Sequence, residues 1–237
     1  DGARTIDTTD GDSVNGAAIT ITGAIDGANA GGTDTLTLDA ANGSIDGTGD
    51  AAVELQSAVE GQSGTQNVTG GEDLEGLDAS GGQIDWANAT VTAGSLTAAG
   101  TNIDLNGNSY QTNGSGSVSF NGPVDLDYSG NVSIQTAGAA GDSISFGSTV
   151  DDDAAGDGTL TVDAGGASVT FGGAIGGGNA PGTLTVTGTN AGLTLPSTTL
   201  AAGANLSVTV AGPLDQSASI TVPGTTNVDA GTNEITL

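Results

Sequence analysis

Apolar and hydroxyl-bearing side chains alternate in short runs along most of the chain. The clearest runs are Thr-Leu-Thr-Val at 159–162, Ser-Val-Thr-Phe at 168–171, Thr-Leu-Thr-Val at 183–186 and Leu-Thr-Leu at 193–195. A period of two places the Val, Leu, Ile and Phe side chains on one face of a β-strand and the Thr and Ser side chains on the other. The sequence therefore predicts many short, two-faced β-strands.

The runs recur at a fixed interval. Leu160 and Val169 are nine residues apart, Val169 and Leu184 fifteen, and Leu184 and Leu193 nine again, so a two-strand unit repeats every 24 residues. Residues 35–45 show the same nine-residue step more than a hundred residues earlier. Self-similarity at such a period is typical of repeat architectures.

Strands of about four residues bury too little apolar surface to survive singly, because ordering the backbone costs roughly 1–2 kcal/mol per residue. Stacking identical units removes this difficulty, since each unit covers its neighbour's apolar face and hydrogen-bonds its neighbour's backbone. We therefore predict an all-β fold, a right-handed parallel β-solenoid with coils of about 24 residues. Roughly ten such coils would form a rod of about 45–50 Å at the usual strand spacing.

The composition supports this prediction over its main structural alternative, a tandem pair of immunoglobulin-like sandwiches with antiparallel strands and a break near residue 100. Glycine accounts for 43 of 237 residues and aromatic residues for 3%. Sandwich cores depend on large aromatic side chains, whereas thin coils with tight corners need glycine at the turns.

We expect residues 1–237 to form one solenoid segment, with an irregular start at 1–16 and degenerate coils at 46–85, where the apolar spacing is uneven. A short helix over 51–60 is the alternative for part of this region. The chain lacks methionine, so Asp1 is expected to be a processed or excised start. The alternating strand at 234–237 is expected to continue into a longer solenoid or to be completed by another molecule.

Charge limits the function. One basic residue, Arg4, stands against 28 acidic residues, and the net charge is −27. A chain with so few cations cannot track nucleic-acid phosphates or dock on anionic membranes. There is no stretch of 18 apolar residues that would predict membrane insertion, and the absence of cysteine leaves stacking as the source of stability.

Aspartates cluster before the run at 159–162, and calcium is the ligand that such a cluster favours, since hard cations prefer several oxygen ligands. The weak metal candidates are Asp151, Asp152, Asp153 and Asp157. A solvated acidic loop is the simpler interpretation of the same residues. No cofactor is required by the predicted fold.

Catalysis is not expected. Histidine is absent, which excludes a Ser-His-Asp triad. A glycosidase needs only two carboxylates, but 28 acidic residues single out no pair, so a carbohydrate-active β-helix enzyme remains an unfavoured alternative.

The phrases at 158–162 and 169–176 resemble the β-strand repeats of large bacterial surface and extracellular fibre proteins, including filamentous-haemagglutinin-type adhesins. The resemblance is best over 17–45 and 143–237 and poor over 46–85. It implies an extracellular or cell-surface location and a role in mechanical reach or adhesion.

These observations predict an extracellular structural protein: a fibre subunit, or a segment of an adhesin shaft, whose coils stack end to end with further copies of itself. The alternative is a surface adhesin that binds host or matrix carbohydrate through side loops at 26–32 and 176–182. Neither nucleic acid nor membrane is an expected partner.

Overall fold

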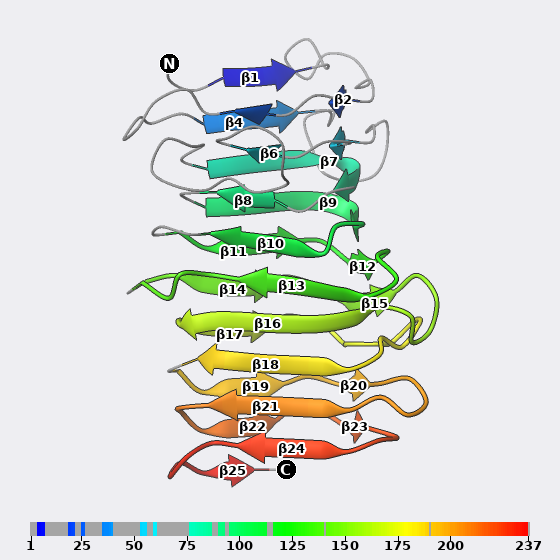
Figure 1. The fold of residues 1–237 in the computed structure, drawn as a ribbon, viewed down its shortest axis with the longest axis vertical. Coiled ribbons are helices and arrows are strands. Elements are labelled where there is room, and N and C mark those ends of the chain that lie inside the picture. The colour runs from blue at the N-terminus through cyan, green and yellow to red at the C-terminus, as the bar shows by residue number, and fades with distance from the viewer. Residues whose placement is uncertain are drawn as a thin grey trace.

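The computed structural model describes residues 95–112, 116–139, 141–189 and 191–236, together with the strands found between residues 4 and 92. Within these residues the chain is all-β, without a helix, and its strands stack as a parallel β-solenoid. Figure 1 shows the strands piled along one long axis, with the N-terminal end and the C-terminal end at opposite ends of the stack.

Three faces run along this axis, and each coil contributes a strand or bridge to each of them. Face A comprises β1 (Arg4–Asp7), β4 (Thr35–Asp39), the first halves of β7 (Gly76–Trp86) and β9 (Ser95–Leu105), then β11 (Val118–Asn121), β14 (Ser143–Phe146), β17 (Ser168–Phe171), β19 (Leu193–Leu195), β22 (Leu214–Gln216) and β25 (Ile235–Thr236).

Face B holds the return strands, which Figure 1 shows running opposite to those of face A. They are β3 (Ile25–Asp26), β6 (Val59–Glu60), β8 (Thr90–Thr92), β10 (Ser109–Thr112), β13 (Asn131–Gln135), β16 (Thr159–Gly166), β18 (Leu184–Thr189), β21 (Leu206–Val210) and β24 (Thr226–Asp229).

Face C is the short side between the other two. It comprises β2 (Ile19–Ile21), β5 (Val53–Leu55), the second halves of β7 and β9, β12 (Val124–Leu126), β15 (Val150–Asp152), a bridge at Ile175, β20 (Thr198–Thr199) and β23 (Ile220–Thr221).

Register along face A confirms the predicted repeat. Successive inward positions are Leu96, Val118, Ile144, Val169, Leu193, Leu214 and Ile235, so the six coils from residue 95 onward measure 22, 26, 25, 24, 21 and 21 residues. Every described strand pair is parallel. The tandem-sandwich alternative, which requires antiparallel neighbours, is therefore wrong.

Alternation of apolar and hydroxyl side chains explains the core. Strand β16 reads as half-buried Thr159 and Thr161 alternating with fully buried Leu160 and Val162, and β14 follows the same pattern. Beneath face A the three phenylalanines form a ladder. The ring centroids of Phe120 and Phe146 are 5.4 Å apart, and those of Phe146 and Phe171 are 5.0 Å apart.

The region predicted to be degenerate contains strands where a helix was the alternative. Strands β5 and β6 occupy Val53–Leu55 and Val59–Glu60, and both pair in parallel with neighbouring coils. On face A, Leu36 pairs with Leu77, so this coil spans 41 residues. In the segment 1–16, β1 pairs with β4.

One detail of the sequence pattern is wrong. Continued alternation after β12 placed Tyr128 inside with Val124 and Leu126. The strand ends at Leu126, and Tyr128 is 38% exposed on the following turn. Asp127 lies next to that turn and accepts a 2.9 Å hydrogen bond from the Asn106 side-chain amide.

The phenylalanine ladder provides a test of the packing. Phe146 is 1% exposed and stacks on both sides, so Phe146→Ala should lower the free energy of unfolding by about 3–5 kcal/mol. Thr170→Ala, on the exposed side of the adjacent strand β17, is the control and should change it by less than about 0.5 kcal/mol. Urea unfolding followed by circular dichroism measures both; comparable losses would contradict this core.

Candidate functional site

Acidic side chains lie in register along face C. The register pairs Glu54 with Asp85, Asp85 with Asp104, Asp104 with Asp125, and Asp125 with Asp151, so five successive coils place a carboxylate at the same position. Neighbouring strands are about 4.8 Å apart. We refer to these five residues as the acidic ladder.

Like charges directly opposite each other destabilise a sheet, and local donors offset part of this cost at two rungs. The Asn102 side-chain amide donates a hydrogen bond to Asp104 Oδ1, and the backbone N–H of Gly178 donates to Asp151 Oδ1 at 2.7 Å. Asp125, which is half-buried, sits between them. The ladder is therefore a strongly negative stripe parallel to the rod axis.

Asp152 breaks the alternation, because its side chain is buried in the core-facing column that holds Leu126 in the previous coil. Its Oδ2 accepts hydrogen bonds from the backbone N–H groups of Gly156 and Gly158, at 2.9 and 3.2 Å. Its Oδ1 is buried without a hydrogen-bond partner. The carboxylate thus ties the loop at 153–158 back onto its own strand.

Burial of the carboxyl is the largest effect and raises the pKa of Asp152 above its ordinary value. The nearby Asp157 carboxylate raises this pKa further, whereas the amides of Gly158 and Gly156 lower it. A Cβ at residue 158 would lie 2.6 Å from Asp152 Oδ1. Glycine is therefore required at 158 for the carboxyl to fit.

The four calcium candidates do not converge. Asp151 points outward on the acidic ladder, Asp152 points inward, and Asp153 and Asp157 are exposed on the loop. Among the described residues, no group of three or more acidic side chains is arranged to hold a metal ion. The geometry instead gives Asp151 and Asp152 the role of accepting loop amides.

The side loop at 176–182 is held firmly by these neighbours. Besides the Gly178–Asp151 bond, the Asn179 side-chain amide donates to the Asp153 carbonyl oxygen at 2.7 Å, and the Asp152 N–H donates to the Asn179 carbonyl oxygen at 3.1 Å. The loop is therefore an ordered projection. Of the other predicted side loop, 26–32, all but Asp26 lies outside the described residues.

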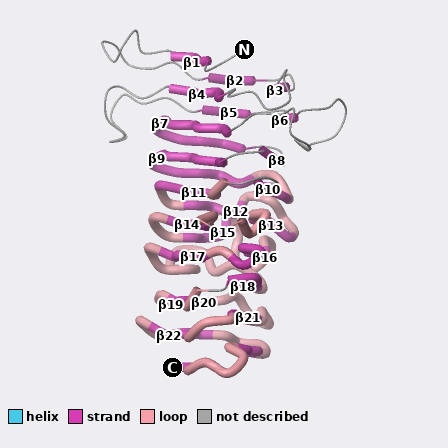
Figure 2. Tube along the Cα trace, turned by 90° about the vertical axis from the view of Figure 1, so that its left-hand side faces the viewer, coloured by secondary structure: helices cyan, strands magenta, loops and turns pink. Residues whose placement is uncertain are grey.

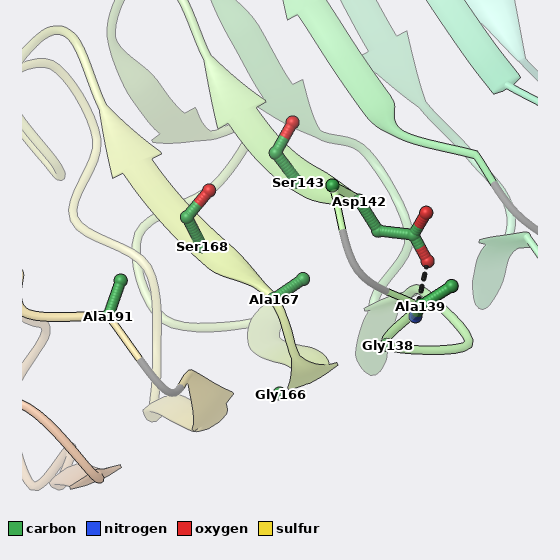
Figure 3. A pocket seen from close by; sticks show the side chains of 9 residues that line it. Gly138, Ala139, Asp142, Ser143, Gly166, Ala167, Ser168 and Ala191 are labelled. Atoms are coloured by element: carbon green, nitrogen blue, oxygen red, sulfur yellow. Dashed lines mark hydrogen bonds between the residues drawn. The ribbon is translucent and has the colours of Figure 1, made fainter.

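A cavity of about 620 Å³ lies at the corner between faces B and A. It is lined by Gly138, Ala139, Gly141, Asp142, Ser143, Gly166, Ala167, Ser168 and Ala191. The Asp142 carboxylate already accepts hydrogen bonds from the Gly116 and Ala139 N–H groups, at 2.9 and 2.8 Å. Figure 3 shows Ser143 and Ser168 on adjacent strands with their hydroxyls pointing the same way.

This cavity offers hydroxyls and small apolar side chains, and its lining contains neither a positive charge nor an aromatic ring. Ligand pockets of similar size depend on aromatic walls and a few free polar groups. The corner cavity is therefore a weak candidate for a binding pocket.

A family model described as "Repeats of unknown function (DUF5649)" matches residues 181–237. The match covers the coils from β18 to β25 and agrees with a β-repeat protein. Neither a curated protein nor a solved structure gives a significant match.

None of the helices in the described part of the chain, which holds none, could span a membrane. The acidic ladder was missed from the sequence, because its members are separated by unequal intervals. Only the alternation at 124–127 indicated that Asp125 faces outward. Asp152 gave no signal, since adjacent aspartates at 151–153 resemble a solvated loop.

Removing the middle rung of the acidic ladder should stabilise the fold. Asp125→Asn eliminates the repulsion from Asp104 and Asp151, and we expect a gain of about 0.2–1 kcal/mol at low salt that disappears as added salt screens the charges. Asp215→Asn is the matched control, because its register neighbours Thr194 and Thr236 are uncharged. Urea midpoints at low and high salt measure the effect; equal gains in both variants would assign it to overall charge.

Asp152 should give a pH signature. Its folded-state pKa is raised, so the folded state holds the proton more tightly and stability falls as pH rises from the unfolded value through the folded one. Asp152→Asn lacks this titration. The stability of the natural protein relative to Asp152→Asn should therefore be greater at pH 4 than at pH 7. Urea unfolding at both values tests this, and a relative stability that increases with pH would contradict it.

Proposed function

We propose that this protein is an extracellular structural protein, a fibre subunit or a segment of an adhesin shaft, built by end-to-end stacking of β-solenoid coils. The observation that supports this proposal most directly is the parallel register maintained from coil to coil. A solenoid of this kind grows by adding coils without changing those already present. Length along one axis is the property that such a fold provides.

The coil formed by β23, β24 and β25 supports the stacking mechanism. In the described structure these strands pair with β20, β21 and β22 on one side. Their apolar side chains are less covered than those deeper in the rod: Ile235 is 43% exposed, and Ile220 and Val228 are only partly buried. This surface matches a further coil with the same alternation, supplied by a continuing chain or by another copy.

A location outside the cell fits the surface. Twenty-eight acidic residues against one basic residue keep a rod soluble and repel other rods at low salt. Threonine, serine and glycine dominate the outward positions, and the proposal involves neither a catalytic step nor a cofactor.

A second candidate function is ligand binding by the side loop at 176–182, with host or matrix carbohydrate as the partner. The hydrogen bonds from this loop to Asp151 and Asp153 favour it, because an ordered loop loses less entropy on binding. Glycan-array binding that disappears when the loop is shortened, with the urea midpoint unchanged, would support this candidate.

End-to-end stacking is tested at Ile235. Ile235→Asp places a charge among apolar side chains of the coil formed by β23–β25, so association of the 237-residue chain should weaken by tenfold or more, about 1.4 kcal/mol. Thr185→Asp adds the same charge to the side of the rod, between Thr161 and Ser207, and should leave end-to-end association unchanged. Sedimentation velocity and electron microscopy at moderate salt give the particle length.

A chain that stays monomeric at high concentration and at moderate salt would contradict end-to-end assembly by separate copies.

A further inference from the structure

Face A is free of charge over five consecutive coils. In the described strands β9, β11, β14, β17 and β19, the outward positions carry only hydroxyl, amide or methyl groups or glycine. These positions are Ser95, Thr97, Ala99, Ser119, Asn121, Ser143, Ser145, Ser168, Thr170 and Thr194. In the central column, Asp78 precedes this stretch and Asp215 follows it.

The other two faces differ from face A over the same coils. Face C carries the acidic ladder through Asp104, Asp125 and Asp151. Face B carries the carboxylate of Asp163 in its central strand β16, and the long side chains of Gln111 and Gln135 stand at the same register position in the two preceding coils. Face A is therefore both the least charged and the smoothest side of the rod.

We propose that face A is a lateral contact surface whose partner is face A of a second copy of this chain. Two molecules with a net charge of −27 repel each other through any pair of acidic surfaces. Face A against face A brings no carboxylate opposite another within the five coils. The partner also has the same strand spacing, so every coil of one copy meets an equivalent coil of the other.

The side chains on face A suit close approach. Ser145 donates a 3.1 Å hydrogen bond to the Ser119 hydroxyl, and Ser143 donates a 3.0 Å bond to the Ser117 hydroxyl. Hydroxyls paired along the ladder need less water when a second sheet covers them. Small side chains also lose little conformational entropy on burial, and sheets packed face to face lie about 10 Å apart.

The contact between two single copies is small. Five strands of about four residues cover a patch of roughly 24 by 13 Å, well below the 800 Å² or so per partner of a stable interface. A single pair is therefore transient. Rods made by end-to-end stacking would present many such patches and associate more tightly, and this bundling step alone rests on the proposed function.

A two-fold pair brings the centre of the patch against itself. Strand β14 is the middle strand of the five, and Ser145 is its central outward residue. The chain contains no cysteine, so a single introduced thiol reports contact without background. Thr161→Cys is the matched control: Thr161 is the half-buried central residue of face B, and it donates a 2.8 Å hydrogen bond to Asn131.

The experiment compares disulfide-linked dimer formation by Ser145→Cys and Thr161→Cys in the 237-residue chain, with a mild disulfide-forming oxidant at moderate salt. We expect Ser145→Cys to cross-link at least about tenfold faster, because contact raises the effective thiol concentration. Adding Thr97→Asp, two coils from the thiol, should slow the Ser145→Cys reaction several-fold and leave the Thr161→Cys reaction unchanged. Urea midpoints verify that all variants fold.

Equal cross-linking rates for the two thiols would overturn the proposal, whether or not the chain also forms long rods. Retention of the chain on an insoluble neutral polysaccharide, lost in Thr97→Asp while the two cross-linking rates stay equal, would also overturn it and assign face A to a glycan. Faster cross-linking of Ser145→Cys in a preparation with no end-to-end assembly would support the lateral contact and contradict the proposed stacking of ends.

Discussion

Hydrogen bonding between the backbones of successive coils is the interaction on which every other feature of this structure depends. Strands of three to five residues cannot persist alone, and each is held by the coil before it and the coil after it. The corners must allow the same stacking. Gly138 and Gly165 both have positive φ, 76° and 58°, and a Cβ on Gly138 would lie 2.1 Å from the Gly165 carbonyl oxygen. Glycine at this corner is therefore a condition for bringing two coils together.

Parallel register has a second consequence, which is that each side chain meets its own kind in the next coil. In the core this is favourable, since Phe120, Phe146 and Phe171 stack and the aliphatic columns are fully buried. On the outside the outcome depends on chemistry. Hydroxyls pair along face A, whereas the carboxylates of the acidic ladder repel. The fold accepts that repulsion on one face, where backbone and amide donors reduce it.

The fold could be predicted from the sequence because its evidence is local. The steps between Leu160, Val169, Leu184 and Leu193 contain both the strand period and the coil period, and the observed pairs match them. The acidic ladder and the neutral face could not be predicted, since coil lengths on face A vary from 19 residues, Leu77 to Leu96, to 41 residues, Leu36 to Leu77. A register across unequal coils is not visible in one sequence. Tyr128 and Asp152 failed for a related reason: strands β12 and β15 end within three residues, so alternation carried past Leu126, or discounted at Asp152, gave the wrong side.

Cohesion along the rod and interactions at its sides are physically separate in this architecture. Axial cohesion comes from buried columns and backbone bonds that involve only adjacent coils, so it does not change with the number of coils. Repulsion from the acidic ladder and any attraction through face A both accumulate with length, because each added coil can add another rung or another patch. A short rod is therefore governed by its core, and a long rod by its faces. The segregation of carboxylates onto face C leaves face A able to accumulate contacts without accumulating the opposing charge.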